Sequence, residues 1–445
     1  MMQKILIANR GEIASRIIKT CNKMGIQTIA IYSDADKDLP FVSEATTSYR
    51  IGEAPVGKSY MNQKAILDIV KKEKVDAVHP GYGFLSENAS FAEIIRKEGT
   101  IFIGPNSKTI QMMGDKLLSR KKMLEAGIPV VPGSNEELTT EEEAVAAANS
   151  IGYPVILKAS GGGGGIGMVR CEDEKTLRKN LETTKKRAKT YFANEKVYVE
   201  KYIQYARHIE VQIFGDKLGN IVHLFERDCS IQRRHQKVVE ESPSPFLTEG
   251  AKEKMLQAAV RAAKAVGYEN AGTVEFIVDE EENFYFLEMN TRLQVEHPVT
   301  EAITGMDLVE WQILVARGEI LPYKQEELES KGHAIEFRLY AEDPVSFLPS
   351  PGHIEVLDWG KGDTRVDSGY KEGVVVTPFY DPMIAKCIVH GENRNEAIEK
   401  ASGFFNQLQI QGIKTNAPLF KHIINDADFK TGKYFTNYLS VKKFN

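Results

Sequence analysis

Two glutamates face each other across a predicted β-hairpin. Residues 273–278 and 284–290 alternate apolar and polar side chains on either side of a polar turn, which is typical of two antiparallel strands. Pairing about that turn places Glu275 nearly opposite Glu288, and facing carboxylates repel each other unless a cation neutralises them. Mg²⁺ takes such oxygen ligands together with phosphate, and Asn290 shares the face of Glu288. The pattern favours a magnesium site over the alternative, a solvated polar face on an edge hairpin.

The polar alternation continues beyond this hairpin. Polar side chains stand at every second position from Glu288 to Glu296, and they include Arg292 and Gln294. If the chain stays extended there, one face lines a polar site while the other packs. Arg292 would then hold an anion, and Glu296 would serve as a general base.

A run of glycines follows a predicted strand at residues 153–158. Residues 161–167 include six glycines, and Lys158 precedes them. Backbone N–H groups in such a run approach phosphate oxygens with no side chain in the way, and the lysine adds a cation. The alternative is a flexible linker, but a linker would not normally interrupt two apolar strand patterns. The run lacks the ending of a Walker A loop.

A third candidate is the charged cluster at residues 226–237, ERDCSIQRRHQK. Acidic neighbours nearly cancel its basic side chains, so the cluster favours the phosphates of a small ligand over a nucleic acid. Cys229 within it is expected to be a buried thiol rather than a nucleophile. Together, the glycine run, the lysines, the paired glutamates and the basic cluster indicate a site that binds a nucleotide with magnesium and transfers a phosphoryl group. On these residues alone, an ATP-dependent kinase and a ligase both stay open.

The elements that must position these residues begin with a strand–helix alternation. The first hundred residues alternate in this way, which favours a parallel, doubly wound sheet. Residues 81–86, GYGFLS, nearly match a dinucleotide fingerprint, but Ser86 replaces the third glycine, so a turn after a strand is the better interpretation. Beyond them we predict helices at 139–148, 177–189 and 303–317, a strand-rich stretch at 198–296, a linker at 323–331, and a smaller β-rich domain from His333 onward.

Length and composition exclude several classes of protein. The 445 residues suggest roughly three domains. With 57 Lys and Arg against 62 Asp and Glu, the formal charge of −5 excludes a strongly basic nucleic-acid binder. The four cysteines form no C-x-x-C pair and fit a reducing compartment. No stretch approaches the roughly 20 apolar residues of a membrane span. We therefore expect a cytoplasmic protein with no nucleic-acid or membrane partner.

Motifs along nearly the whole chain match those of one enzyme family. In order they are IANRGEIASRI from Ile7, HPGYGFLSENA from His79, FIGP from Phe102, MGDK ending at Lys116, KASGGGGG from Lys158, ERDCSIQRRHQKVVEE from Glu226, EMNTRLQVEHPVTE from Glu288, HAIEFRLYAEDP from His333 and LPSPG from Leu348. With them the chain resembles the biotin carboxylase subunit of acyl-CoA carboxylases, within the ATP-grasp superfamily. The resemblance implies a multidomain α/β and α+β fold with a Rossmann-like N-terminal domain (1–113), an ATP-grasp domain (114–330) with a mobile glycine-rich lid (about 131–203), and a β-rich biotin carboxylase C-terminal domain (331–445).

The resemblance also implies roles for individual residues. ATP would contact Lys116, Lys158, Gly163, Gly164, Gly165, Glu200, Lys201, Tyr202, Ile203, His208, Gln232 and His235, with 200–203 at the adenine hinge. Glu275, Glu288 and Asn290 would bind Mg²⁺ or Mn²⁺. Bicarbonate would be held by Lys237, Arg292, Gln294 and the Val295 backbone. The catalytic group would be Glu296 as the base, with Lys237, Arg292 and Arg338, the last facing the biotin ureido oxygen.

The implied reaction is the ATP- and bicarbonate-dependent carboxylation of biotin through carboxyphosphate. It is the first half-reaction of acetyl-CoA carboxylase, in fatty acid synthesis, or of a related acyl-CoA carboxylase. The family's attachment motif Ala-Met-Lys-Met is absent, so we expect biotin on a separate biotin carboxyl carrier protein, carboxyltransferase subunits as further partners, and a homodimer. The alternatives are another ATP-grasp ligase that joins a carboxylate to an amine, and a nucleotide-binding subunit without turnover. One departure is Ile166, where the family usually carries Arg or Lys.

Overall fold

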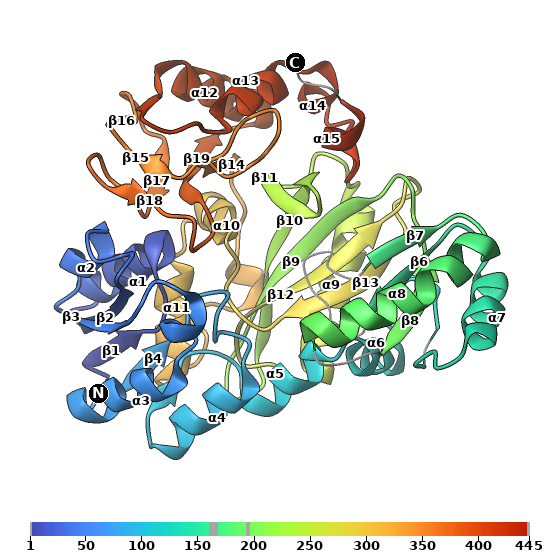
Figure 1. Ribbon diagram of the computed structural model, residues 1–445, viewed down its shortest axis with the longest axis horizontal. Coiled ribbons are helices and arrows are strands. Elements are labelled where there is room, and N and C mark those ends of the chain that lie inside the picture. Colours follow the sequence, from blue (N-terminus) through green and yellow to red (C-terminus); the bar gives the residue numbers. More distant parts are fainter. Residues whose placement is uncertain (1, 135, 160–167, 193–195, 443–445) are drawn as a thin grey trace.

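The chain folds into an N-terminal domain, a central sheet that the C-terminal residues complete, and a lobe set to one side (Figure 1). The computed structural model describes residues 2–134, 136–159, 168–192 and 196–442. The predicted multidomain architecture of mixed α/β and α+β type is confirmed. No helix in these ranges combines the length and the apolar character that crossing a membrane requires.

The N-terminal domain is built on a parallel sheet. Its strand order, β3-β2-β1-β4-β5, is that of a doubly wound nucleotide-binding fold. The strands are β1 (Lys4–Ile7), β2 (Gln27–Ser33), β3 (Thr47–Gly52), β4 (Ala77–His79) and β5 (Ile101–Phe102), and the helices are α1 (Gly11–Lys23), α2 (Pro40–Glu44), α3 (Gln63–Glu73), α4 (Ala89–Lys97) and α5 (Ser107–Gly114). Its central strand β1 is apolar and almost entirely buried, as expected when helices cover both faces of a sheet. The predicted strand–helix alternation is therefore confirmed.

A long antiparallel sheet, the central sheet, has the strand order β13-β12-β9-β10-β11-β14-β19-β17. The strands are β9 (Arg207–Gly215), β10 (Ile221–Arg233), β11 (Gln236–Ser242), β12 (Asn270–Val278), β13 (Phe284–Asn290), β14 (His333–Tyr340), β17 (Arg365–Ser368) and β19 (Met383–Gly391). Because β14 pairs with β11, this central sheet runs across the boundary expected between residues 330 and 331. C-terminal residues thus complete the sheet that carries the predicted glutamate hairpin.

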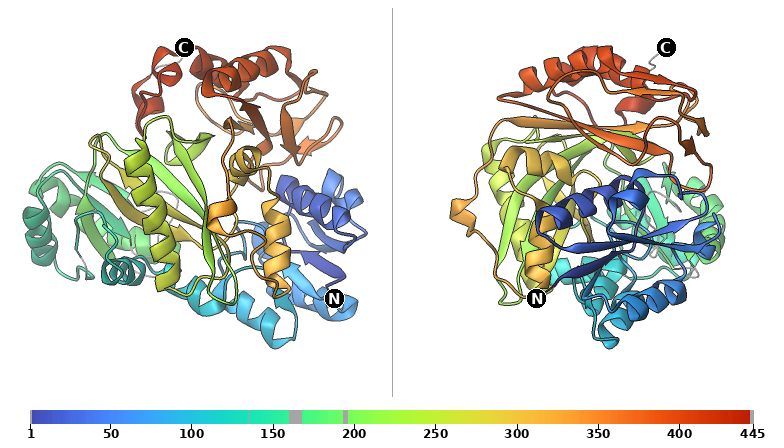
Figure 2. Two further views of the ribbon diagram at one scale, coloured as in Figure 1. Left: turned by 180° about the vertical axis from the view of Figure 1, so that it is seen from behind. Right: turned by 90° about the vertical axis from the view of Figure 1, so that its left-hand side faces the viewer.

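Helices cover the central sheet and the C-terminal end. Helix α9 (Glu249–Ala265) packs on β9 and β10, as the view from behind shows (Figure 2). The C-terminal part has short strands β15 (Gly352–His353), β16 (Val356–Asp358), β18 (Val375–Val376) and β20 (Gln409–Gln411), and helices α12 (Arg394–Gln407), α13 (Ala417–Asn425), α14 (Ala427–Lys430) and α15 (Tyr438–Val441). It is therefore strand-rich up to Gly391 and mainly helical beyond it.

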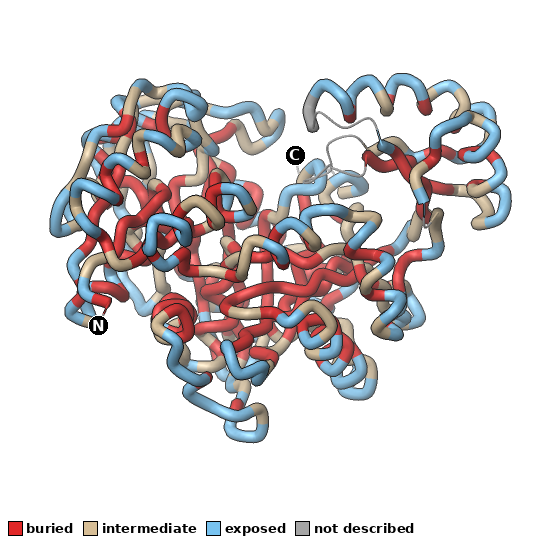
Figure 3. The backbone as a smooth tube through the Cα atoms, turned by 90° about the horizontal axis from the view of Figure 1, so that it is seen from below, coloured by how far each residue is buried: buried red, intermediate tan, exposed pale blue. Residues whose placement is uncertain are grey.

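The lobe at the side, which we call the lid lobe, has a sheet and a core of its own. Strands β6 (Val155–Ala159), β7 (Met168–Cys171) and β8 (Val197–Lys201) pair in the order β7-β6-β8, and α7 (Glu141–Ile151) and α8 (Glu174–Phe192) cover them. Val155, Leu157, Leu181 and Val199 are buried in this core. Seen from below, the lobe stands apart from the rest of the molecule, in which the buried residues lie mainly in the interior (Figure 3).

Two predictions of secondary structure were incomplete. The helix expected at 303–317 is two helices, α10 (His297–Thr304) and α11 (Leu308–Ala316). Gly305 has φ +72°, which a glycine adopts without steric cost and which ends α10. Helix α9 was not singled out within the strand-rich stretch, although its buried alanines at 258, 259, 262 and 263 recur at helical spacing. The predicted linker at 323–331 contains a 3₁₀ turn, Gln325–Glu327.

Candidate active site

A cavity of about 810 Å³ is lined by residues of the N-terminal domain, the central sheet and the lid lobe. Every predicted site residue that the structure describes lines it: Lys116, Lys158, Glu200, Lys201, Tyr202, Ile203, His208, Gln232, His235, Lys237, Glu275, Glu288, Asn290, Arg292, Gln294, Val295, Glu296 and Arg338. Gly163, Gly164, Gly165 and Ile166 lie outside the described residues. The structure thus gathers candidates that are spread over more than two hundred positions of sequence.

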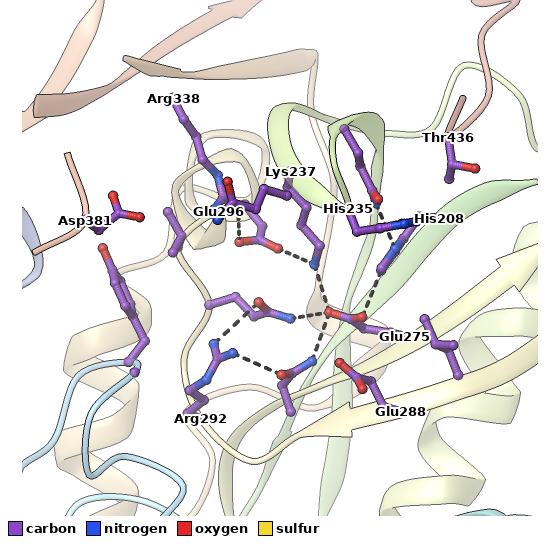
Figure 4. Close-up of a pocket in the computed structure, with 18 of the residues that line it drawn as sticks. His208, His235, Lys237, Glu275, Glu288, Arg292, Glu296, Arg338, Asp381 and Thr436 are labelled. Carbon is purple, nitrogen blue, oxygen red and sulfur yellow. Dashed lines mark hydrogen bonds and ion pairs between the residues drawn. The ribbon is translucent and has the colours of Figure 1, made fainter. Parts of the chain in front are cut away.

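The predicted register of the glutamate hairpin is confirmed. Glu275 on β12 is the cross-strand partner of Glu288 on β13, and both side chains face the cavity (Figure 4). Lys116, the first residue of α6 (Lys116–Glu125), lies 3.5 Å from the Glu288 carboxylate. The Asn290 amide nitrogen donates to Glu275 over 2.9 Å, and its oxygen accepts from Arg292. Carboxylate and amide oxygens converge here, and this donor set fits a hard dication.

The buried Glu275 carboxylate is held by four neighbours. Its Oε1 atom accepts from Lys237 (2.8 Å), Asn290 (2.9 Å) and Gln294 (2.8 Å), and Oε2 lies 2.9 Å from His208 Nε2. Burial raises the pKa of Glu275, but the charges of Lys237 and His208 outweigh burial and hold that pKa well below its ordinary range. The carboxylate is therefore ionised at neutral pH and available to a cation.

Lys237 is the centre of the charge network. It lies at the start of β11, just after the turn at Arg234 and His235, where both residues have positive φ. Its Nζ atom lies 2.8 Å from Glu275 and 2.6 Å from Glu296 (Figure 4), and 2.5 Å from Glu210. Burial lowers the pKa of Lys237, but these three carboxylates raise it well above its ordinary value. Lys237 is thus a permanent cation in the cavity.

The extended alternation predicted from Glu288 to Glu296 is wrong. Strand β13 ends at Asn290, and residues 291–296 form an irregular loop that leads into α10. Beyond Asn290 the chain leaves its partner β12, because the Thr291 backbone N–H donates to Glu87 of the N-terminal domain instead. Arg292, Gln294 and Glu296 still reach the cavity, through the course of this loop rather than through a strand face.

Glu296 is fully buried between two cations. Its Oε1 accepts from Lys237 over 2.6 Å, and its Oε2 accepts from Arg338 of β14 over 2.8 Å. Burial raises the pKa of Glu296, but Lys237 and Arg338 outweigh burial and lower it far below the ordinary value. Arg338 also donates to Glu240 over 2.6 Å. Glu296 therefore stays an anion between the two cations.

Arg292 points into the cavity from the other side of Glu275. Its guanidinium donates to Glu87 over 2.8 Å and to the Asn290 side-chain oxygen over 3.0 Å. Burial lowers the pKa of Arg292, but Glu87 outweighs burial and raises it. The cation is oriented by fixed partners, as an anion-binding arginine requires.

The other end of the cavity is lined by the lid lobe. Lys158 on β6 lies 2.5 Å from the Glu200 carboxylate of β8, and Arg120 of α6 lies 3.1 Å from the same carboxylate. Gln232 donates to His208 Nδ1 over 3.0 Å, which leaves the other ring nitrogen of His208 facing Glu275. Lys201, Tyr202, Ile203 and His235 complete this end.

Sequence reasoning missed the acids that hold the cations. Glu87, Glu210 and Glu240 neutralise Arg292, Lys237 and Arg338, respectively. Glu210 and Glu240 lie in the strands RHIEVQIFG and QKVVEES, which are largely buried but mix polar and apolar residues, so no local sequence pattern singles these two acids out. Glu87 follows the predicted turn, and no such pattern singles it out either.

Two secondary predictions are confirmed. Cys229 is fully buried, and burial raises the pKa of its thiol well above the ordinary value, so it is an inert thiol rather than a nucleophile. Residues 81–86 lie in a loop between β4 and α4 and do not open a helix. Asn9 donates to the carbonyls of Pro80 and Tyr82 over 2.7 Å each and so holds this loop against the cavity.

Comparisons with known proteins agree along the whole chain. Family models match at residues 1–110 (biotin carboxylase, N-terminal domain), 115–324 (carbamoyl-phosphate synthase L chain, ATP binding domain) and 336–441 (biotin carboxylase C-terminal domain). The chain is 55% identical over 441 residues to biotin carboxylase 2 of Bacillus subtilis, with 99% of each chain covered.

Solved structures agree as well. The chain is similar to a biotin carboxylase of Campylobacter jejuni in a β-γ-ATP complex, with a TM-score of 0.97, 47% identity and 99% of each chain covered. It is also similar to the biotin carboxylase domain dimer of Hydrogenobacter thermophilus 2-oxoglutarate carboxylase in complex with MgADP, ADP and bicarbonate. That match has a TM-score of 0.96 and 47% identity, and covers 99% of this chain and 98% of the other.

Proposed function

This chain belongs to the biotin carboxylase family and is an ATP-dependent ligase that carboxylates biotin, and from that premise we propose how its own residues carry out the reaction. The observation that carries the proposal is the Glu296 carboxylate, which lies between Lys237 at 2.6 Å and Arg338 at 2.8 Å in the cavity that the glutamate hairpin also lines. A base, two anion-binding cations and paired carboxylates are thus within one cavity.

In the first stage we propose that bicarbonate lies against Lys237, Arg292, Gln294 and the Val295 backbone. Glu296 accepts the bicarbonate proton, and the freed oxygen attacks the γ-phosphorus of ATP. The bond from that phosphorus to ADP breaks, so carboxyphosphate and ADP form. Lys237 and Arg292 are held by fixed carboxylates before the substrate arrives, so little reorganisation is needed to stabilise the developing negative charge.

In the second stage carboxyphosphate breaks down to CO₂ and phosphate. Phosphate accepts the N1′ proton of biotin, and the nitrogen attacks CO₂ to form carboxybiotin. Arg338 would stabilise the negative charge on the ureido oxygen, since Glu240 and Glu296 fix its guanidinium at the cavity wall. A closed lid lobe would exclude water from carboxyphosphate.

The nucleotide would lie at the lid end of the cavity. We propose that Lys116 and Lys158 bind the phosphates and that residues 200–203 hold the adenine, with His208, Gln232 and His235 along the nucleotide. Glu275, Glu288 and Asn290 would hold Mg²⁺ or Mn²⁺, because Glu275 and Glu288 are cross-strand partners at the cavity wall and Asn290 contacts Glu275. A bound dication there would neutralise part of the charge on the phosphate oxygens.

We further propose that the biotin is attached to a separate carrier protein, that carboxyltransferase subunits use the product, and that the chain forms a homodimer. The complex that it serves would be acetyl-CoA carboxylase or a related acyl-CoA carboxylase in fatty acid synthesis, and its location would be cytoplasmic. Isolation of the biotinylated carrier that co-purifies with this chain would identify the complex. Light scattering would measure the oligomeric state.

The reaction is tested by its dependence on substrates. We expect ATP cleavage by the purified chain to require both bicarbonate and biotin, and carboxybiotin to appear in equal amount. Each substrate omitted in turn is the control. ATP cleavage that instead requires an amine acceptor would support the alternative carboxylate–amine ligase, and absence of turnover would support a non-catalytic nucleotide-binding subunit.

A further inference from the structure

Lys386 on β19 holds the loop that carries Glu296, although it does not line the cavity. Its side chain is fully buried, and its ammonium donates to the Val295 carbonyl over 2.9 Å. Arg338 is its cross-strand partner on β14. Neighbouring cations on two strands therefore hold neighbouring residues of the loop, since Arg338 binds the Glu296 carboxylate and Lys386 binds the Val295 carbonyl.

This contact matters because residues 291–296 have no strand partner. The Leu293 carbonyl accepts from Arg292, and the Gln294 carbonyl accepts from His297, both of which are close in sequence. The Val295 carbonyl is held from 91 positions away. In a trans peptide the N–H points opposite to the carbonyl, so these bonds set the direction of the Val295 and Glu296 amides.

The ammonium of Lys386 is neutralised by the N-terminal domain. Glu12, in the first turn of α1, lies 3.1 Å from it and is itself buried. Asp367 is the cross-strand neighbour of Lys386 on β17. A buried ammonium without such partners would cost several kcal/mol, so this pairing permits a cation behind the loop.

We propose that Lys386 is a positioning residue for the bicarbonate end of the cavity, with Glu12 as its counter-charge. By fixing the Val295 carbonyl, it sets the direction of the Glu296 amide and holds the course of the loop that presents the Val295 backbone and the Glu296 carboxylate to the anion. The inference rests on the proposed function, in which bicarbonate lies against the Val295 backbone. Lys386 acts through the loop and touches no reactant.

The test separates bicarbonate binding from ATP binding. Lys386→Met removes the ammonium and keeps an unbranched side chain, so we expect the KM for bicarbonate to rise about tenfold or more, as the loss of a hydrogen bond from a charged donor predicts. The KM for ATP should change less than about twofold, because the nucleotide end does not contact the loop carbonyl. Lys400→Met on α12 is the matched control, since it removes a surface lysine paired with Glu396, and it should leave both constants unchanged.

Two further variants test the proposal if Lys386→Met folds poorly. Glu12→Gln removes the counter-charge, keeps an oxygen acceptor and should raise the KM for bicarbonate by a smaller factor. Lys386→Arg restores the charge and should recover part of the loss. ADP binding, measured by calorimetry, reports whether each variant is folded.

A folded variant with an unchanged KM for bicarbonate, or an equal rise in both KM values, would overturn the proposal. Failure of the proposed function would instead show in the unmodified chain, as ATP cleavage that is independent of bicarbonate.

Discussion

The central sheet lines much of the cavity, and we call it the floor. The floor and the lid lobe both contain ion pairs, but two of these networks differ in how deeply they are buried and in which elements they join. In the floor, Arg227 and Glu210 are fully buried and lie 2.5 Å apart on different strands, and Lys237 joins the same glutamate. In the lid lobe, Arg178 pairs with Glu141 and Glu174, and all three side chains are more than a third exposed. The floor network joins strands and domains, whereas the Arg178 pairs join the surfaces of two helices. The buried pair of Lys158 with Glu200 is the exception in the lid lobe, and it faces the cavity.

This difference indicates a division of work. Buried ions are costly unless every one has its partner, so the floor must be complete before a substrate arrives, and it can then stabilise developing charge without reorganising. Exposed ion pairs contribute little. The lid lobe is held together by its own apolar core and contacts α6 through Glu200 and Arg120. Val130, just before the lobe in sequence, forms a bridge with Phe286 of β13 in the floor. We therefore expect the chemistry to take place at the floor and the lid lobe to cover the nucleotide.

The largest expected effect is the loss of the base in the floor. Glu296→Gln removes the negative charge between Lys237 and Arg338 but keeps the size of the side chain. We expect biotin-dependent ATP cleavage to fall at least about 100-fold, as for the loss of a general base, while ADP affinity changes little. Steady-state assays and ADP titration calorimetry measure the two quantities. Turnover that survives the substitution would refute the assignment of the base.

The second prediction compares one arginine from each region. Arg227→Met breaks a buried pair and leaves Glu210 short of a partner, so we expect a loss of about 3–5 kcal/mol in the free energy of unfolding. The matched variant Arg178→Met in the lid lobe should lose less than about 1 kcal/mol. Urea unfolding, followed by circular dichroism, measures both. Equal losses in the free energy of unfolding would contradict the difference in ion-pair energetics between the floor and the lid lobe.

The third prediction concerns pH. Burial raises the pKa of the Glu240 carboxyl from 4.5 to about 7, although Arg338 opposes this, so the folded chain binds the proton more tightly than the unfolded chain. The resulting stabilisation is present below the ordinary pKa and is lost as the pH rises toward 7. Relative to Glu240→Gln, the unmodified chain should therefore lose about 2 kcal/mol of stability between about pH 5 and pH 8.

Glu143 of the lid lobe is the control for this pH dependence. Hydrogen bonds from the backbone of Thr140 and from Thr139 lower its pKa to about 2. Its stabilisation is present above the ordinary pKa and is lost only as the pH falls toward 2, so Glu143→Gln should show no such difference over the same range. Urea unfolding at each pH measures the free energy of unfolding of each variant. If this free energy depended on pH in the same way for Glu240→Gln and the unmodified chain, the raised pKa of Glu240 would be contradicted.

The smallest effect is expected in the glycine run of the lid. Ile166→Arg adds the cation that the family usually carries, and a single added cation strengthens phosphate binding modestly, so the KM for ATP should fall about two- to fivefold. The KM for bicarbonate, which depends on the floor, should stay the same. Ile166→Met is the matched control without charge. An unchanged KM for ATP would show that this lid position does not contribute.

Much of the site could be predicted from local sequence patterns, and the predictions that were wrong have local causes. That Glu275 lies nearly opposite Glu288 was predictable because a short turn sets the register of the strands on either side of it. A register shift between Glu275 and Phe276, which the turn does not predict, makes the two glutamates direct partners. The extended face through Glu296 was wrong, because a period of two cannot distinguish a strand from a loop that turns polar groups toward one cavity. Helix α10 ends early for a similar reason, since one glycine overrides the helical spacing around it.

By itself the sequence determined the strand–helix alternation of the first domain, the facing glutamates, the place of the glycine run and the family motifs, all of which depend on neighbours in the chain. Tertiary structure alone decided that Glu210, Glu240 and Glu12 neutralise Lys237, Arg338 and Lys386. The physical reason is that a buried charge takes its partner from whichever strand packs beside it, and the pairing of β11 with β14 joins segments that no local pattern brings together.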